Sequence, residues 1–458
     1  MRHLLCVISA ATAVLSACSP TTTVNRATPP LPPPMGWNSW NSGMELNESA
    51  VRDTIDAMVS SGMRDAGYQY VNLDAGWAAP FRTSSGELIA DPDRFPHGVK
   101  PLADYAHQRG LQFGLYNSPF NQTCGQDPRI GSFGHEKRDA ATFADWGIDY
   151  LKYDWCREDP DHDAQVRAFS AMGEALRNSG RRIVYSINPN SSNDPAAGGR
   201  FDWSGIADVV RTSGDLVPVW LSVLPTQGPG DPFVSGLFKG VPDQFASAAT
   251  VPARSGYRGD PDMLVVGVTW SEFYLNHMDL LRQAVRSRSL TPEQLVQFEP
   301  ALALPEQTMQ QIATTQPSLT DDEQRSHFSL WAMLAAPLIA GNDLRSMSAT
   351  TLSILTNREV IAVDQDPLFR KAHAIGGDRR IWAKPMADGS VTVALFNTSN
   401  ATADLSTTAS EVGLPSAQCY TARDLWAHTS ETTTGTLEAQ SLAPHAVRLL
   451  RVSGGCRS

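Results

Sequence analysis

Two acidic segments carry the side chains best suited to chemistry, and the first is Leu151-Lys152-Tyr153-Asp154. Alternation along a β-strand would place Lys152 and Asp154 on the same face. A neighbouring cation keeps a carboxylate ionised, and an ionised carboxylate can act as a nucleophile toward an anomeric carbon. A strand-end salt bridge without a catalytic role is the alternative interpretation of this segment.

The second segment, residues 210–215 (VRTSGD), ends in Asp215 and follows a different apolar run, so another strand must carry it. Two carboxylates that face each other across a sugar ring form the catalytic pair of a glycosidase, and in retaining enzymes they lie about 5–5.5 Å apart. One carboxylate attacks the sugar and the other protonates the leaving oxygen. The two segments together therefore indicate glycoside hydrolysis.

Two further acidic clusters have ordinary structural interpretations. Residues 159–163 (DPDHD) fit the solvated start of a helix, and Asp260-Pro261-Asp262 fits a turn, with metal binding as the alternative for both. No histidine and cysteine spacing typical of zinc sites occurs. No Gly-x-Ser-x-Gly segment supports a serine hydrolase. We expect no metal site.

Apolar runs and amphipathic stretches alternate between residues 35 and 365, and these elements must position the acidic residues. The runs are 68–73, 111–116, 148–153, 182–187, 207–210 and 337–340, and the amphipathic stretches include 49–65, 98–109, 135–146 and 163–179. This alternation predicts a parallel sheet with crossover helices. About eight repeats favour a (β/α)8 TIM barrel of class α/β. A doubly wound open sheet is the alternative, but the sequence shows no glycine-rich phosphate-binding loop after the first predicted strand.

Six aromatic or polar residues lie at or just past the ends of predicted strands: Trp40, Asp74, Tyr116, Asp154, Asn188 and Asp215. In a TIM barrel the C-terminal ends of the strands converge on one mouth, where active sites are built. The barrel prediction therefore brings these side chains together.

Two regions depart from the barrel pattern. Residues 366–458 contain short β-like segments separated by Ser, Thr and Gly, which predict a C-terminal antiparallel β-sandwich domain. Residues 270–322 look helical and polar. We interpret them as an insertion near the barrel mouth, with a plain surface excursion as the alternative.

The N-terminus predicts export. Residues 1–18 combine a positive start, a short apolar stretch and the sequence Leu15-Ser16-Ala17-Cys18, which resembles a bacterial lipoprotein cleavage box with Cys18 lipidated. A Pro- and Thr-rich linker, 19–34, would follow. We expect a bacterial cell-envelope lipoprotein, periplasmic or on the cell surface, that meets the membrane only through this lipid. Ordinary secretion is the alternative. The net charge of −11 argues against a nucleic-acid partner.

Four cysteines remain after the export segment: Cys124, Cys156, Cys419 and Cys456. An even number in an oxidising compartment favours disulfides. Four cysteines allow three pairings, of which proximity in the sequence favours Cys124–Cys156 and Cys419–Cys456.

Several stretches of the chain resemble glycoside hydrolase family 27, the family of α-galactosidases (melibiases) and α-N-acetylgalactosaminidases. The matching stretches are 34–41 (PMGWNSWN), 70–74 (YVNLD), 114–116 (GLY), 131–156 (GSFGHEKRDAATFADWGIDYLKYDWC), 211–216, 260–264 and 327–347 (HFSLWAMLAAPLIAGNDLRSM). The run 131–156 is long and specific. The resemblance covers residues 34–366, with a looser fit in the C-terminal domain.

The resemblance implies a role for each matching residue. Asp154 would be the nucleophile and Asp215 the acid/base, in hydrolysis with retention and without a metal or cofactor. Cys124 and Cys156 would form the family's active-site disulfide. The expected contacts to the sugar of an oligosaccharide or polysaccharide come from Trp40, Asp74, Tyr116, Lys152, Asn188, Arg211 and Asp262.

Three departures from the family pattern bear on the sugar. Asp74 is followed by Ala75, where the family usually has a second aspartate that helps to read O4 and O6 of galactose. Losing such a charged hydrogen bond costs roughly 1.5–3 kcal/mol. Asn188, which belongs to the region that senses the 2-position, matches neither the galactosidases nor the N-acetylgalactosaminidases. The third departure, 270–322, would reshape the leaving-group side.

These departures leave several activities open. We predict a retaining exo-glycosidase acting on terminal α-D-galactosyl residues. The alternatives are β-L-arabinopyranosides or α-N-acetylgalactosaminides as substrates, or a surface lipoprotein that binds glycans without cleaving them.

Overall fold

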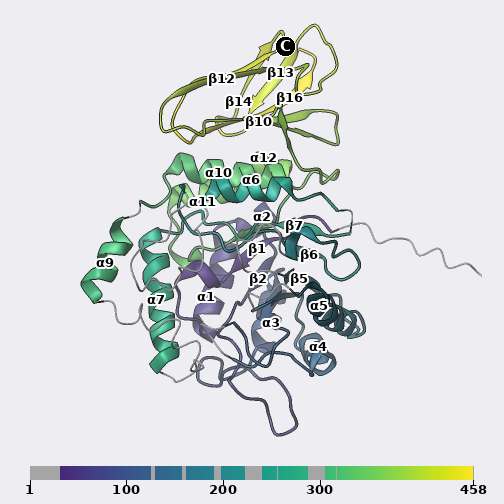
Figure 1. Ribbon diagram of the computed structural model, residues 1–458, viewed down its shortest axis with the longest axis vertical. Coiled ribbons are helices and arrows are strands. Elements are labelled where there is room, and N and C mark those ends of the chain that lie inside the picture. Colours follow the sequence, from purple (N-terminus) through teal and green to yellow (C-terminus); the bar gives the residue numbers. More distant parts are fainter. Residues whose placement is uncertain are drawn as a thin grey trace, which may run out of the picture.

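The computed structural model describes residues 31–124, 129–156, 161–189, 198–221, 240–254, 256–286, 305–315 and 317–456. The predicted signal segment, Cys18 and most of the linker lie outside the described residues. Figure 1 shows a barrel with a separate β-domain stacked on one side of it.

Eight parallel strands form the barrel sheet, in the order β7-β6-β5-β4-β3-β2-β1-β8. They are β1 (Met35–Asn38), β2 (Tyr70–Asn72), β3 (Gln112–Asn117), β4 (Tyr150–Asp154), β5 (Val184–Asn188), β6 (Val209–Arg211), β7 (Arg258–Asp260) and β8 (Leu338–Ala340). Leu264, just after β7, makes a parallel bridge to Ala340 in β8. This bridge brings the two ends of the sheet together, so the TIM-barrel prediction is confirmed.

The apolar runs did not predict strands β1 and β7. β1 has four residues, and β7 is the tripeptide Arg258-Gly259-Asp260. β7 has no apolar run because two of its three residues are charged, and one of them, Asp260, lies at the mouth. Its register against β6 pairs Arg211 with Asp260, which sets these two polar residues at one level.

Helices surround the barrel sheet. They are α1 (Glu48–Ser60), α2 (Met63–Ala66), α3 (Lys100–Gln108), α4 (Glu136–Asp145), α5 (His162–Arg177), α6 (Val241–Thr250), α7 (Trp270–Arg286), α9 (Glu306–Thr315), α10 (Asp321–Leu334), α11 (Ala349–Leu355) and α12 (Arg358–Asp364). The predicted stretch 49–65 is two helices, because Gly62 has a φ of 84° and ends the first of them.

The range 270–322 is helical where it is described, in α7 and α9 (Figure 1). The beginning of α7 is not a polar surface element, since Phe273, Tyr274 and Met278 are buried in the barrel core. This half of α7 is therefore part of the barrel wall. Residues 287–304 lie outside the described part of the chain.

The described end of the predicted linker packs against the barrel. Leu31 lies against a small cluster formed by the first residues of four strands: Tyr70, Tyr150, Val184 and Val209. Arg258 Nε donates to the Leu31 carbonyl at 2.6 Å, and Leu338 N donates to the Pro34 carbonyl at 2.9 Å. Residues 31–34 thus cover the N-terminal end of the barrel, opposite the mouth.

The C-terminal domain is antiparallel, as predicted. A six-stranded sheet has the order β14-β13-β16-β11-β10-β9, and β12 pairs with β15 separately. The strands are β9 (His373–Ile375), β10 (Asp378–Pro385), β11 (Val391–Phe396), β12 (Ala403–Thr408), β13 (Tyr420–Asp424), β14 (Thr429–Thr433), β15 (Thr436–Leu442) and β16 (Val447–Gly454).

The two domains share one continuous apolar core. Trp382, Phe396 and Leu449 of the β-domain belong to the same buried cluster as the barrel. Lys384 crosses this boundary, and its ammonium donates at 2.7 Å to the carbonyls of Ala332 and Val363. The β-domain is therefore fixed to the outer helices of the barrel.

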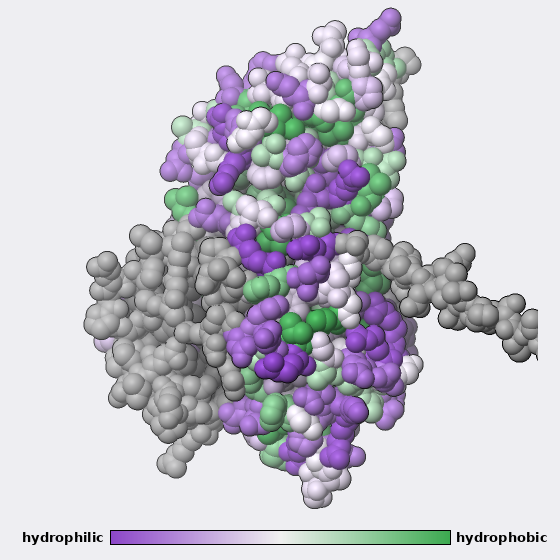
Figure 2. Space-filling view, turned by 45° about the vertical axis from the view of Figure 1, so that its right-hand side comes forward, coloured by the Kyte–Doolittle hydropathy of each residue, from purple (hydrophilic) through white to green (hydrophobic). Residues whose placement is uncertain are grey.

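Both predicted disulfides are present, Cys124–Cys156 and Cys419–Cys456. Disulfides persist in oxidising compartments, which agrees with the predicted export. None of the described helices has the length and apolar character to cross a membrane. On the face seen in Figure 2, hydrophobic residues lie in small groups among hydrophilic ones.

Candidate active site

A cavity lies at the C-terminal ends of the barrel strands. It is lined by Asn38, Asn72, Tyr150, Lys152, Asp154, Ser186, Ile187, Asn188, Arg211, Asp260, Asp262, Met263 and Ile339. Five predicted site residues are in this lining, from strands β4, β5 and β6 and the loop after β7. The barrel therefore brings these residues together as predicted.

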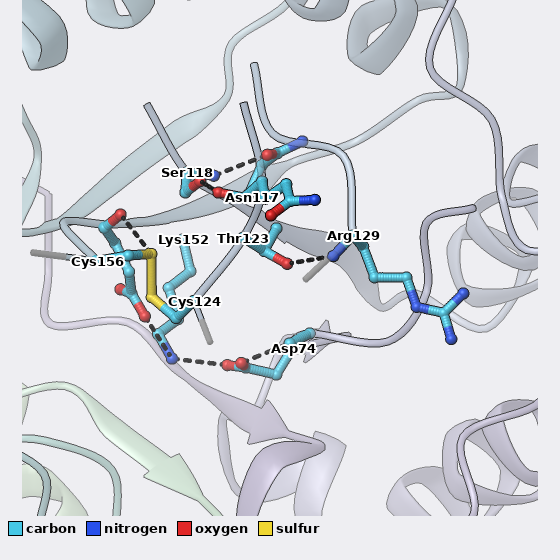
Figure 3. The surroundings of a disulfide bond; sticks show 11 residues. Asp74, Asn117, Ser118, Thr123, Cys124, Arg129, Lys152 and Cys156 are labelled. Carbon is cyan, nitrogen blue, oxygen red and sulfur yellow. Dashed lines mark hydrogen bonds and ion pairs between the residues drawn. A yellow bond between two sulfur atoms is a disulfide. The ribbon is translucent and has the colours of Figure 1, made fainter. Parts of the chain in front are cut away.

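Lys152 links two carboxylates, Asp154 at the end of its own strand β4 and Asp74 just after β2, two strands away. Its Nζ lies 2.7 Å from Asp74 Oδ2 and 3.4 Å from Asp154 Oδ2. Asp74 follows β2 and also accepts a hydrogen bond from Asn38 Nδ2 at 2.9 Å. Figure 3 shows the contact of Lys152 with Asp74 beside the Cys124–Cys156 disulfide. Asp154 Oδ1 is buried and has no hydrogen-bond partner among the described residues, so this oxygen is not committed to another protein group.

Arg211 organises the other side of the cavity. Its Nη2 lies 3.0 Å from Asp215 Oδ1, and its Nη1 lies 3.0 Å from Asp262 Oδ1. The side chains of Arg211 and Asp262 are each 4% exposed, whereas that of Asp215 is 62% exposed. Asp215 therefore lies at the open rim, where a leaving group could reach it.

Asp262 has a strained backbone with a φ of 96°, which is rare for a residue other than glycine. Its N–H donates to Asp260 Oδ1 at 2.8 Å, and its carbonyl accepts from Trp331 Nε1 at 2.8 Å. Its Oδ2 accepts from Leu216 N at 2.7 Å. These contacts hold Asp262 in place, and such strain concentrates at functional sites.

The electrostatics of the cavity are dominated by burial and by excess negative charge. Burial raises the pKa of Asp154 to about 6, although the positive charge of Lys152 opposes this shift. The negative charges of Asp74 and, more weakly, of Asp215 also act to raise the pKa of Asp154, whereas Arg211 acts to lower it. Burial lowers the pKa of Lys152, but Asp154 and Asp74 outweigh it and the net shift is upward. Lys152 therefore stays charged.

The raised pKa of Asp154 predicts how activity depends on pH. If Asp154 must be ionised to attack, kcat/KM falls as the pH drops through about 6. In Lys152→Met the stabilising cation is gone, so the pKa of Asp154 should rise and the acidic limb should move to higher pH. A pH profile of kcat/KM measures this shift. Lys100→Met, which removes an exposed ion pair with Asp104, should leave the limb in place. An acidic limb that stays unmoved in Lys152→Met would contradict this account.

Trp40 and Tyr116, which were also predicted to contact the sugar, are not among the residues that line the cavity. The ammonium of Lys152 lies 5.2 Å from the ring centre of Tyr116. Trp40 packs edge-on against His277 of α7, with ring centres 5.3 Å apart. Its predicted role as a wall of the sugar site stays a prediction. Asn188 ends β5 and lines the cavity.

Several residues of the site were not predicted from the sequence. Asn38, Asn72, Tyr150, Ser186 and Asp260 all line the cavity. Asn38 and Asn72 end strands β1 and β2, so position at a strand end was the signal available for them. Within the described residues, no group of three or more His, Cys, Asp or Glu is arranged to hold a metal ion.

The disulfide anchors the segment that follows Asp154. Cys156 lies two residues after Asp154, and its partner Cys124 lies in the loop after β3. The same loop is held by Arg129, whose Nη1 contacts Asp91 Oδ2 at 2.6 Å. The position of Asp154 is therefore supported by a strand on one side and by a covalent bond on the other.

Comparison with known proteins places this geometry in a family. Residues 32–278 and 308–366 match the profile described as Alpha galactosidase A, and residues 376–452 match the Alpha galactosidase C-terminal beta sandwich domain. The stretch between the two barrel matches, 279–307, falls within the range predicted as an insertion.

Similar proteins match this chain over nearly its whole length. Alpha-galactosidase 2 of Arabidopsis thaliana is 36% identical over 423 residues, covering 92% of this chain and 89% of the relative. An alpha-galactosidase of Coffea arabica is 37% identical over 405 residues, covering 88% of each. The crystal structure of alpha-galactosidase I from Mortierella vinacea superposes with a TM-score of 0.73 at 31% identity, covering 93% of this chain and 98% of that one. The chain therefore belongs to the α-galactosidase family, glycoside hydrolase family 27, and is a glycoside hydrolase.

Proposed function

We propose that the protein is an exo-acting, retaining α-galactosidase that uses Asp154 as nucleophile and Asp215 as acid/base. The observation that carries this proposal is the pairing of a buried, Lys152-supported carboxylate in the cavity with a rim carboxylate held by Arg211. The relatives named above support the choice of α-galactosides as substrates.

In the first step, Asp154 attacks the anomeric carbon while Asp215 protonates the glycosidic oxygen. The leaving alcohol departs and a galactosyl ester forms on Asp154. In the second step, Asp215 takes a proton from water, which attacks the same carbon and releases galactose with its original configuration. Each step breaks one C–O bond and one O–H bond and forms one of each, so the anomeric carbon keeps its oxidation state and no redox partner is needed.

The charges around the cavity fit the transition state of this reaction. Five carboxylates surround it (Asp74, Asp154, Asp215, Asp260 and Asp262), whereas two cations of the described part of the chain, Lys152 and Arg211, form ion pairs with them. An oxocarbenium-like transition state gains positive charge at the sugar ring. A fixed excess of negative charge in a buried site stabilises it more than it stabilises the neutral substrate.

A panel of nitrophenyl glycosides tests the proposed specificity. We expect the highest kcat/KM with the α-D-galactoside, and lower values with the β-L-arabinopyranoside and the α-N-acetylgalactosaminide. Binding without turnover across the whole panel would instead support a glycan-binding lipoprotein.

Ala75 favours β-L-arabinopyranosides as a second candidate class of substrate. Both oxygens of Asp74 are already engaged, Oδ2 by Asn38 and Lys152 and Oδ1 by the N–H of Ala75. Residue 75 itself supplies no second carboxylate for a hydroxymethyl group. Arabinopyranose resembles galactose without that group, so it loses nothing at this position.

Restoring the carboxylate should shift this preference. Ala75→Asp is expected to raise the ratio of kcat/KM for galactoside to that for arabinopyranoside by about 10–100-fold, the equivalent of a charged hydrogen bond. The matched control is Ala75→Asn, which has a similar shape without the charge and should change the ratio less. An unchanged ratio in Ala75→Asp would argue against a role for this position in sugar choice.

The proposal for location is a bacterial lipoprotein held by a lipid on Cys18. The cleavage-box sequence at residues 15–18 supports it. Residues 31–34 cover the end of the barrel opposite the mouth, so a lipid-linked chain would enter the enzyme on the side away from the substrate. Radiolabelled palmitate incorporated into the wild type but not into Cys18→Ser would support the lipid. Equal labelling of the two would overturn it.

A further inference from the structure

A buried glutamine on α6 connects the loop that carries Asp215 to the loop that carries Asp262. The inward face of α6 is formed by Val241, Gln244, Phe245 and Ala248. Residues at this spacing lie on one face of a helix, and such a face usually packs into the core. Gln244 is the one polar residue of the four. Its side chain is fully buried.

The amide of Gln244 donates to two backbone carbonyls. Its Nε2 lies 2.6 Å from the Gly214 carbonyl and 2.8 Å from the Pro261 carbonyl. Two acceptors fix the amide orientation, because the flipped form would point its oxygen at both carbonyls. Its Oε1 has no hydrogen-bond partner among the described residues, and an unpaired buried polar atom is a cost that an ordinary core residue avoids.

The two carbonyls belong to the peptide groups that precede Asp215 and Asp262. The peptide group that follows Asp215 is also held, since Leu216 N donates to Asp262 Oδ2 at 2.7 Å. Both peptide groups that flank Asp215 are therefore fixed to the loop after β7, one through Gln244 and one through Asp262. The Asp215 side chain is 62% exposed, and its Oδ1 accepts from Arg211 Nη2 at 3.0 Å. Its backbone thus determines much of its position.

We infer that Gln244 is a positioning residue for proton transfer, whose side-chain amide holds the peptide before Asp215 at a fixed place relative to Asp262. The inference rests on the proposed role of Asp215. Gln244 is buried behind the two loops and is not among the residues that line the cavity. A shift of about 1 Å in a reacting group can lower the rate about 100-fold. Loss of the two Gln244 hydrogen bonds should therefore slow the step in which Asp215 protonates the leaving group.

The test compares substrates that differ in their need for protonation. Gln244→Met keeps the length and apolar fit of the side chain but removes both donors. On melibiose, whose leaving alcohol must be protonated, we expect kcat/KM to fall by about 10–100-fold. On α-galactosyl fluoride, whose leaving group needs little protonation, we expect a fall of less than about threefold. A merely structural role would lower both by the same factor.

Two reference variants separate failure of this inference from failure of the proposed function. Asp215→Asn must show the same selective loss, and if it does not, the proposed acid is wrong and the proposed function fails. If Asp215→Asn shows it but Gln244→Met lowers both substrates equally or neither, the positioning inference is overturned. Gln165→Met is the matched control, because Gln165 is also a buried helix glutamine that donates to a loop carbonyl, that of Pro189. It should leave the substrate ratio unchanged.

A second variant covers the case in which Gln244→Met does not fold, as judged by its thermal unfolding. Gln244→Asn keeps the amide one methylene shorter, so the two hydrogen bonds lengthen without loss of the donors. It should show a smaller selective loss on melibiose in the same direction. An unchanged ratio in a folded Gln244→Asn would then overturn the inference.

Discussion

Asp154→Ala is expected to lower turnover of nitrophenyl α-D-galactoside by at least about 10⁴-fold, while the protein remains folded. The reason is that the substitution removes the only group proposed to form the covalent intermediate. Since burial of the ionised carboxylate is unfavourable, as its raised pKa shows, removing it should not unfold the barrel. Initial rates and thermal unfolding of the variant measure both expectations.

Chemical rescue separates loss of the nucleophile from general damage. Azide that enters the space vacated in Asp154→Ala attacks from the face that the carboxylate occupied, so the product should be β-galactosyl azide. Asp149→Ala is an informative control, because Asp149 lies at the opposite end of β4 and contacts His107 and Arg181. It should affect stability more than the chemical step. Wild-type rates in Asp154→Ala would end the assignment.

Asp215→Ala is the second large effect, with an expected loss of about 10²–10⁴-fold on melibiose. The loss should be much smaller in the first step with α-galactosyl fluoride, because fluoride leaves with little protonation. The galactosyl ester on Asp154 should then accumulate, since no base activates water.

Azide distinguishes this variant from Asp154→Ala. It needs no general base, so it should attack the accumulated ester and restore turnover of the fluoride in Asp215→Ala. Attack on the ester from the opposite face gives α-galactosyl azide, the opposite anomer from that expected with Asp154→Ala. The β-anomer from both variants would contradict the assignment of the two roles.

The strength of these predictions follows from how the barrel builds the site. Asp154 ends β4 within the strand register that pairs it with Asn188 of β5. Asp215 lies beyond the end of β6, and its position depends on contacts with Arg211, Asp262 and Gln244 of α6. The nucleophile is therefore placed by the sheet, whereas the acid/base is placed by a network of loop contacts. We expect Asp215 to be the more sensitive of the two to distant substitutions.

Much of the fold could be predicted from the sequence because the strands that bury apolar side chains leave apolar runs. β3, β4 and β5 are examples, and their ends correctly located Tyr116, Asp154 and Asn188. β1 and β7 left no such run, because β1 (Met-Gly-Trp-Asn) alternates its two large apolar residues with a glycine and an asparagine, and β7 consists of charged residues around a glycine. Their presence depends on pairing with neighbours that are distant in the sequence.

The site was predictable to the extent that its residues are ionised groups in recognisable segments. Lys152, Asp154 and Arg211 belong to that class. Gln244 does not, because an amide on a helix has no distinctive pattern and its role arises from two loops that meet only in the folded chain. Leu31 is similar. Its proline-rich surroundings indicated a stiff linker between the lipid and the domain, but Leu31 packs against Tyr70 and Tyr150 at the end of the barrel.

Trapping of the covalent intermediate tests the central claim most directly. The wild-type protein would be incubated with 2-deoxy-2-fluoro-α-galactosyl fluoride, digested and analysed by mass spectrometry. We predict one fluorogalactosyl group per chain, attached to Asp154. A label on a different carboxylate, or β-galactose as the first product released from the natural substrate, would contradict the claim.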